Sequence, residues 1–313
     1  MDFQPTEEQR DLRAGLRDLL SGRYGPEALR AAVDGGAAVD RGLWRELGRA
    51  GFFSLRLPEA EGGVGLGLPE AVLLFEEAGR ALLPGPLVAT HLAAGVVPGA
   101  ARGTAVVTAF DLGERLVAHL GEADAVLGAP VLPAGEPVRS ADPLTPLHRL
   151  AVAGDSSAYR GTGALLTAAL QVGSASRTLE LAVRYAGERE QFGQPIGAFQ
   201  AVKHLCADML VRAEVARTAV YAAAVVAAAV AAGPAAGGAG AGEITAAKLL
   251  ADEAAVRNAR DCLQVHGGMG FTWEAEVHLH LKRAWVRAEQ WRTAADAEEL
   301  LAAELLGAGS RAS

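Results

Sequence analysis

The stretch REQFGQPIGAFQAVKH, residues 189–204, lies between two long alanine-rich segments and differs from both. SASRTLELAVRYAGE precedes it and AVKHLCADMLVRAE overlaps its end, and both of these flanks have the composition of helices. Pro195 and Gly197 interrupt the helical pattern, because proline lacks a backbone donor and glycine is a poor helix former. The stretch is therefore predicted to connect two long helices.

Three side chains with distinctive chemistry gather where the first of these helices ends. Arg189, Gln191 and Phe192 offer a cation, an amide and an aromatic ring within four positions. Such a set suits a diphosphate, because arginine forms bidentate charge-assisted hydrogen bonds and a ring supplies a stacking surface. The alternative is a well-formed turn in which Arg189 pairs with Glu188 or Glu190, and residue types alone favour that interpretation.

A second distinctive stretch, LQVHGGMGFTWE at 263–274, ends another helical segment. Gly267, Gly268 and Gly270 permit close backbone approach to a ligand, and Gln264 offers an amide for a purine or ribose. Helices commonly end in glycine, so this motif taken singly is also compatible with a simple helix end.

The bulk composition excludes several classes of protein. The chain has 313 residues, half of them hydrophobic, and a net charge of −8, which argues against nucleic acid as a main partner. The amphipathic acidic start does not resemble a signal peptide, and the apolar stretch at 219–232 is too short and alanine-rich for a membrane span. Cys206 and Cys262 fall in helical patterns and indicate neither a disulfide framework nor a zinc site. We expect a cytoplasmic protein without a membrane partner.

The chain divides into three regions by pattern. Residues 1–100 are predicted to form an N-terminal helical domain, in which Thr6 caps the first helix and Trp44 and Leu47 share the face of another. Residues 101–152 contain the short valine-rich segments TAVVTAF, RLVAHL and DAVLGAPVL, which predict a small β-rich middle domain. Residues 153–313 are predicted to form an antiparallel four-helix bundle.

The bundle helices are expected at 164–188, 199–232 and 243–265, with a further helix in the tail and a glycine-rich turn at 233–242. Small and apolar side chains recur at spacings of three and four, which predicts one buried face for each of two helices. In the first helix this face comprises Phe199, Val202, Cys206, Met209, Ala213, Ala216 and Val220, and in the second Ile244, Ala247, Ala251 and Ala254. Because such faces bury little apolar area, we expect them to pack against each other and against another subunit.

Taken together, the two motifs resemble the C-terminal bundle of the acyl-CoA dehydrogenase family. The N-terminal segments EEQRDLRAGLRDLL, LWRELGRAGFFSLRLPEAEGG and LLFEEAGRALLPGP are similar to the helical first domain of that family. The resemblance covers most of the chain except about residues 101–150. It implies a mainly α fold and an FAD-dependent α,β-desaturation of an acyl thioester.

The resemblance also implies roles for individual residues. In that family FAD lies at a subunit interface, and these two motifs hold the adenosine diphosphate half of a flavin bound in the neighbouring protomer. By this resemblance Arg189, Gln191 and Phe192 belong to the first contact. Gln264, Gly267 and Gly268 belong to the second.

The chain departs from the family at the places that carry the chemistry. Residues 101–150 contain no counterpart of the motifs that hold the flavin ring and the thioester. The family's catalytic glutamate lies either about twenty residues after the glycine motif, where this chain has Trp291 and Arg292, or at 160–170, which contains no carboxylate. The catalytic residue is therefore unknown, with Glu289 and Glu274 as the nearest candidates.

Two other groups of residues give little evidence of a functional site. His278 and His280 stand two apart, so on a helix they point to different faces and no metal site is expected. Glu274 and Glu276 beside the glycine motif are either acid–base groups or the solvated start of a helix.

Three hypotheses follow. The first is a subunit that contributes the FAD clamp to a full-length acyl-CoA dehydrogenase homologue in a hetero-oligomer. The second is a non-enzymatic scaffold relative that binds no flavin. The third is a self-sufficient homo-oligomeric oxidoreductase that uses an unrecognised base, and the flavin colour of the purified chain distinguishes it from the other two.

Overall fold

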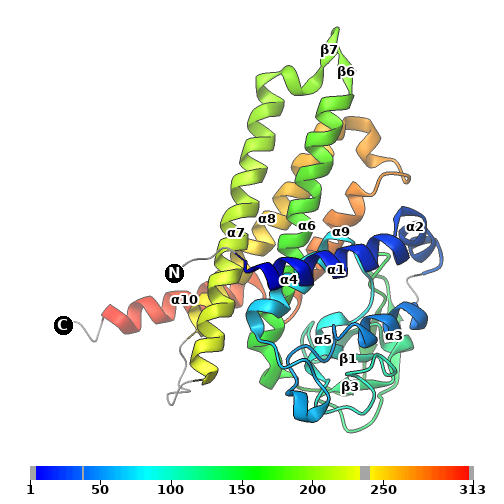
Figure 1. The fold of residues 1–313 in the computed structure, drawn as a ribbon, viewed down its shortest axis with the longest axis vertical. Helices are drawn as coiled ribbons and strands as arrows, with labels where there is room; N and C mark the ends of the chain where they lie inside the picture. Colours follow the sequence, from blue (N-terminus) through cyan, green and yellow to red (C-terminus); the bar gives the residue numbers. More distant parts are fainter. Residues whose placement is uncertain (1–4, 37–38, 233–239, 310–313) are drawn as a thin grey trace.

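The computed structural model describes residues 5–36, 39–232 and 240–309. Three long helices set its long axis: α6 (Arg160–Glu188), α7 (Gln200–Ala232) and α8 (Ala241–His266). They lie side by side, with a hairpin at one end and a lobe of short helices and strands at the other (Figure 1). The predicted mainly α architecture is confirmed, and the long helices begin and end within a few residues of the expected positions.

Five helices precede the bundle. They are α1 (Glu7–Arg23), α2 (Pro26–Asp34), α3 (Arg41–Arg49), α4 (Leu68–Arg80) and α5 (Leu87–Leu92). Thr6 caps α1 as expected: its hydroxyl accepts from the Gln9 N–H at 3.2 Å, and the Gln9 side chain accepts from the Thr6 N–H at 3.0 Å. Trp44 and Leu47 of α3 are both buried.

Short strands follow between α5 and α6. β1 (Val107–Ala109) pairs in parallel with β3 (Ala125–Leu127), and β5 (Leu147–Leu150) pairs antiparallel with both β2 (Leu116–Ala118) and β4 (Gly135–Val138). We call residues 107–150 the β-segment. The three valine-rich runs correspond to β1, β2 and β3, whereas β4 lies in a stretch whose pattern gave no indication of a strand.

The chain ends in two further helices, α9 (Val277–Glu289) and α10 (Ala294–Gly309). Both pack against α8. Residues 233–239 of the predicted glycine-rich turn lie outside the described residues. Its last two residues are helical, because α8 already begins at Ala241.

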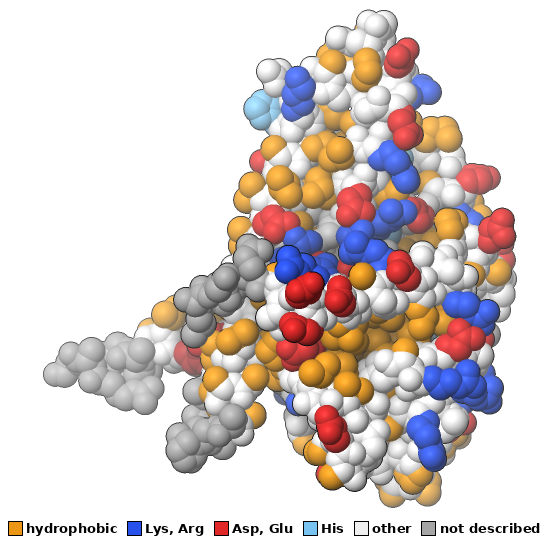
Figure 2. Space-filling model, viewed as in Figure 1, with side chains coloured by type: hydrophobic (Ala, Val, Ile, Leu, Met, Phe, Trp, Pro, Cys, Tyr) orange, Lys and Arg blue, Asp and Glu red, His pale blue; other side chains and the backbone are white. Residues whose placement is uncertain are grey.

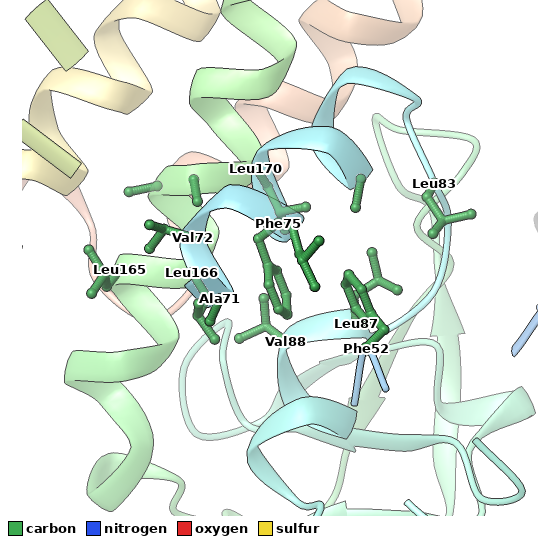
Figure 3. Close-up of a cluster of buried hydrophobic side chains, with 14 of the residues drawn as sticks. Phe52, Ala71, Val72, Phe75, Leu83, Leu87, Val88, Leu165, Leu166 and Leu170 are labelled. Atoms are coloured by element: carbon green, nitrogen blue, oxygen red, sulfur yellow. The ribbon is translucent and has the colours of Figure 1, made fainter. Parts of the chain in front are cut away.

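Part of the main hydrophobic core lies where α4 and α5 pack against α6. Phe75 of α4 is fully buried between the bundle helix and the short helices, with the Phe52 ring packed against it at a ring-centroid distance of 4.9 Å and a tilt of 30° (Figure 3). Leucines of α6, among them Leu165 and Leu166, close the other side. The first half of α6 is therefore a core element of both the bundle and the N-terminal helices.

Two glycines allow α4 and α6 to cross with their backbones in direct contact. A Cβ on Gly79 would lie 2.1 Å from the Leu170 carbonyl oxygen, and a Cβ on Gly173 would lie 2.0 Å from the Glu76 carbonyl oxygen. Distances this short exclude any side chain at either position. We call this reciprocal contact the glycine crossing.

Two carboxylates next to the glycine crossing are almost completely buried. Glu77 accepts hydrogen bonds from Arg13 at 2.8 Å and from Arg17 at 2.7 Å. Glu76 accepts from Arg217 of α7 at 3.2 Å and from the hydroxyl of Tyr221 at 2.5 Å. Charged side chains gather accordingly where α1 crosses the bundle (Figure 2).

Replacing Gly173 by alanine should destabilise the fold by about 1–3 kcal/mol, because the backbones of α4 and α6 must move apart. Gly187→Ala is the matched control in the same helix, since a Cβ there meets nothing within 4 Å. The control should be neutral or stabilising by up to about 1 kcal/mol. Urea unfolding of both variants measures the difference, and equal stabilities would contradict the role of the crossing.

Candidate functional site

The first motif forms a tight hairpin at the far end of the bundle. β6 (Glu190–Gln191) and β7 (Gln194–Pro195) pair antiparallel, and Phe192 and Gly193 form the two-residue turn between them. Both turn residues have positive φ, 54° and 79°, as a type I′ turn requires. Phe192 is therefore strained and is also 91% exposed. Strain and exposure of this kind are typical of a residue placed for contact with another molecule.

Arg189 is the C-cap residue of α6 and lies directly beside this hairpin. Its N–H donates to the Tyr185 carbonyl at 2.8 Å, and its carbonyl accepts from the Ile196 N–H at 2.8 Å, so the backbone is fixed. The side chain is exposed and has no carboxylate within 4 Å among the described residues. The ion pair with Glu188 or Glu190, expected for a simple turn, is thus not formed in the described structure.

The second motif ends α8. Gln264 lies exposed in the last turn, and Gly267 ends the helix at φ 57°, in the left-handed region that favours glycine. Gly267 and Gly268 are exposed, and a Cβ on either would meet nothing within 4 Å. Their backbone is therefore open to a ligand from the solvent side.

A ring stack joins the two motifs. Tyr185, four residues before Arg189, lies against His266, the residue before Gly267, with ring centroids 4.2 Å apart and planes inclined by 21°. The Nδ1–H of His266 donates to the Cys262 carbonyl at 2.8 Å, which fixes the orientation of the imidazole. Sequence reasoning missed this pair, although both residues lie inside the quoted stretches.

A second, smaller hydrophobic core packs against this Tyr185–His266 ring stack. It connects the ends of α6, α7, α8 and α9 and comprises Leu181, Ala182, Ala186, Met209, Ala259, Cys262, Leu263, Val265, Val277 and Leu281. The two motifs are therefore held by one rigid end of the bundle. We call this end, with the six predicted residues, the bundle tip.

The residues of the bundle tip fit the adenosine diphosphate half of a dinucleotide. Among the described residues, Arg189 is a cation without a competing carboxylate and the exposed Gln264 amide has no side-chain partner, while Gly267 exposes its backbone. All of these groups face solvent, so a ligand on them would be covered on one side only. A second protein surface is needed to enclose it.

The region between the β-segment and α9 is more buried than the bundle tip. Trp291, in the turn between α9 and α10, is buried with φ 64°, and a Cβ on Gly163 of α6 would lie 2.3 Å from its ring. One cavity beside it has a volume of about 30 Å³ and holds one or two water molecules. A second cavity, of about 280 Å³, is also lined by Trp291, together with Asp111 and Glu289. Trp291 is also the residue found where the resemblance places a catalytic glutamate.

A buried carboxyl that the sequence gave no reason to select lies next to Trp291. Asp111 accepts from Gln290 Nε2 at 2.8 Å, and its carbonyl accepts from the Trp291 N–H at 2.6 Å. Burial raises its pKa from the ordinary 3.8 to about 7. Its other carboxyl oxygen, Oδ1, has no hydrogen-bond partner among the described residues.

The remaining candidates from the sequence do not converge on one place. Glu274 and Glu289 lie exposed at opposite ends of α9, and Glu276 pairs with Arg177 at 2.7 Å. His278 and His280 are buried, and the described part of the chain contains no group of three residues able to hold a metal.

Comparison with known proteins agrees with this geometry. The model of the acyl-CoA dehydrogenase N-terminal domain matches residues 6–107, and that of the C-terminal domain matches residues 161–294. An acyl-CoA dehydrogenase of Mycobacterium tuberculosis, IpdE2, is 34% identical over 303 residues, covering 90% of this chain and 92% of the relative. The chain belongs to the acyl-CoA dehydrogenase family.

Solved structures of the family superimpose along nearly the whole chain. The ChsE4–ChsE5 complex of Mycobacterium tuberculosis matches with 25% identity and a TM-score of 0.83, covering 98% of this chain and 99% of the matched one. Butyryl-CoA dehydrogenase of Megasphaera elsdenii matches with 21% identity and a TM-score of 0.83, covering 98% and 100%, and at this identity it supports the fold alone.

The helix α7 of this acyl-CoA dehydrogenase family member is long and apolar enough, by composition, to cross a membrane. In the fold it packs against α6 and α8, and 28% of its most apolar window is buried. Its predicted inner face is buried at Met209, Ala213, Ala216 and Val220, and half-buried at Phe199, Val202 and Cys206. The whole predicted face of α8 is buried.

Phe192→Asn should stabilise the isolated chain by about 1 kcal/mol, because asparagine tolerates the left-handed region better than phenylalanine. Phe271→Asn is the control, since Phe271 is also an exposed aromatic but has no positive φ. Urea unfolding should show a gain for the first variant and none for the second. A loss of stability in Phe192→Asn would contradict the strain at the turn.

The buried carboxyl predicts a pH dependence of stability. Because folding raises the pKa of Asp111, the folded chain binds more protons than the unfolded chain between pH 3.8 and about 7. Ionisation of Asp111 therefore lowers the free energy of unfolding progressively as the pH rises through that window, by at most about 4 kcal/mol in total. Asp111→Asn should weaken the dependence of the unfolding free energy on pH. Glu114→Gln should leave that dependence unchanged, because Glu114 is an exposed carboxylate of the same loop. Unfolding free energies measured from pH 5 to 8 test the difference.

Proposed function

We propose that this chain is a subunit of an acyl-CoA dehydrogenase-type flavoprotein and contributes the adenosine diphosphate clamp to the FAD of a partner subunit. The observation that carries the proposal is the contrast between the two ends of α6. The bundle tip is open, and Arg189 there has no carboxylate within 4 Å among the described residues, whereas at the other end the buried Trp291 stands where the resemblance places the catalytic glutamate.

Each clamp residue has a defined task in this proposal. Arg189 neutralises the diphosphate, Gln264 hydrogen-bonds the adenosine, and Gly267 and Gly268 let the backbone approach the ligand. Phe192 covers the ligand from the hairpin side. When bound, FAD accepts the hydride removed from the β-carbon of an acyl thioester.

The partner is proposed to be a full-length homologue that supplies the flavin-ring pocket and the glutamate. The matched structure of ChsE4–ChsE5 is by its name a complex of two different chains, which supports this arrangement. α7 also exposes an apolar face with Leu210, Val211 and Val215, which suits a subunit interface (Figure 2). A soluble, cytoplasmic complex without nucleic acid belongs to the same proposal.

The rival hypotheses have less support. A homo-oligomer with its own base would use Glu289 or Glu274, but both are exposed. A scaffold without flavin has no need for an unpaired Arg189. A chain that is yellow on its own and bleached by an acyl-CoA would favour the homo-oligomer.

The decisive experiment is co-purification with a full-length homologue, followed by the ratio of flavin to protein chains. We expect fewer flavins than chains, acyl-CoA-dependent bleaching only in the complex, and none with this chain alone. One FAD per protomer in the isolated chain would overturn the proposal.

Arg189→Ala tests the clamp within that complex. Loss of a charge-assisted contact costs about 1.5–3 kcal/mol, so FAD affinity should fall roughly tenfold to a hundredfold. Arg184→Ala is the control, because Arg184 is an exposed arginine of the same helix five residues earlier. Flavin titration that gives equal affinities for the two variants would remove Arg189 from the site.

A further inference from the structure

The segment that carries the glycine motif, residues 267–276, has little packing of its own, and we call it the glycine loop. It begins as a short 3-10 helix, η5 (Gly267–Phe271), and continues as a turn that leads into α9. Within η5 only Gly270 is buried, whereas Met269 and Phe271 are 57% and 75% exposed. The position of the glycine loop therefore depends on its contacts with other elements.

A charged side chain of the N-terminal helices holds the far end of the glycine loop. Arg30 lies on α2, which stands next to this loop although 243 residues separate Arg30 from Trp273 in the sequence (Figure 1). Its Nη1 donates to the Trp273 carbonyl, and its Nη2 donates to the Glu274 carbonyl at 2.8 Å. Because the guanidinium is planar and rigid, two bonds to consecutive carbonyls fix both the position and the orientation of the turn.

The half-exposed ring of Trp273 makes three weaker contacts at the same turn. Its Nε1–H donates to the carboxylate of Asp34, also on α2, at 3.4 Å. The ring stacks on His278 of α9, with centroids 5.2 Å apart and planes inclined by 24°. The Lys282 ammonium lies 5.0 Å from the ring centroid, within the range of a cation–π interaction. The turn is thus joined to both α2 and α9.

The order of the glycine loop matters for binding because the loop offers backbone to a ligand. Glycine has more conformational freedom than any other residue, so a loop with three glycines loses much entropy when it is fixed. A loop that is held before the ligand arrives avoids this loss during binding. The end of α8 holds the start of the loop, since the Gly267 N–H donates to the Leu263 and Gln264 carbonyls. Arg30 holds the other end.

We propose that Arg30 is a positioning residue of the adenosine diphosphate clamp, an inference that rests on the proposed function. Arg30 does not contact the ligand itself. It acts through the backbone of the glycine loop, which it keeps in the conformation that presents Gly267 and Gly268. The N-terminal helix α2 thereby becomes part of the binding machinery, although both clamp motifs lie in the C-terminal bundle.

Hydrogen exchange in the isolated chain tests the tether without flavin or partner. Arg30→Met removes the donors and keeps an unbranched side chain, so α2 retains its packing. The protected amides of residues 267–276 should exchange about tenfold faster or more, as expected when a hydrogen bond from a charged donor is lost. The amides of the hairpin at 190–195, which also belongs to the bundle tip, should be unchanged. Equal exchange of the glycine loop in both chains would overturn the inference, whatever the flavin does.

Flavin titration of the complex with the full-length homologue tests the consequence for binding. FAD affinity should fall about three- to tenfold in Arg30→Met, because the loop must then be ordered during binding. Arg30→Lys keeps the charge and a donor, and its affinity should lie between the two. Arg23→Met is the matched control, since Arg23 of α1 pairs with Glu46 at 2.9 Å, and it should leave the affinity unchanged. A lower unfolding free energy in Arg30→Met with unchanged FAD affinity would make Arg30 a structural residue only and overturn the inference.

Arg189→Ala, titrated in the same series, separates this inference from the proposed function. Weaker FAD binding in both Arg189→Ala and Arg30→Met supports the two together. If Arg189→Ala weakens binding and Arg30→Met does not, the clamp stands and only the role of Arg30 is wrong. If neither variant weakens binding, the clamp itself is wrong and the role of Arg30 falls with it.

Discussion

The glycine crossing between α4 and α6 is the contact on which the rest of the fold depends. Because Gly79 and Gly173 bring the two backbones together, the N-terminal helices share one core with the bundle. The same approach places Glu76 and Glu77 inside the protein, where burial of a carboxylate is tolerated only with full pairing. The arginines of α1 and α7 supply that pairing. The crossing thus determines both the position of α1 and the charge pattern around it.

The two ends of α6 are built on different principles. Around its first half, large leucine and phenylalanine side chains form a buried hydrophobic core. At its C-terminal end, the helix is held by a smaller hydrophobic core and one ring stack, and the polar groups face solvent. A rigid support with exposed functional groups is what a binding surface requires, since the groups are positioned before the ligand arrives.

The sequence was informative where the signal is local. The spacing of Ile244, Ala247 and Ala251 predicted the buried face of α8, and Thr6 predicted the start of α1. The two motif stretches also stand out because their chemistry is unusual in an alanine-rich chain, and their role as a binding site stays a prediction.

Features that depend on contacts distant in sequence were not predictable. Glu77 looks like a surface carboxylate until α1 brings Arg13 and Arg17 to it, sixty or more positions earlier in the chain. Asp111 looks like a turn residue until the loop after α9 covers it. The strand β4 has no alternating pattern, and its pairing with β5 becomes visible only in three dimensions.

The length of α6 has an evolutionary consequence. Its 29 residues span roughly 43 Å at a rise of about 1.5 Å each, so the hairpin and the β-segment hardly share a contact. Substitutions that accumulate at one end of α6 therefore do not change the structure of the other end. After gene duplication, one copy can lose its own active site by drift. Selection on the function of the other copy can still preserve the distant hairpin of the first. Division of labour between two paralogous chains is the outcome that such a long, stiff helix makes accessible.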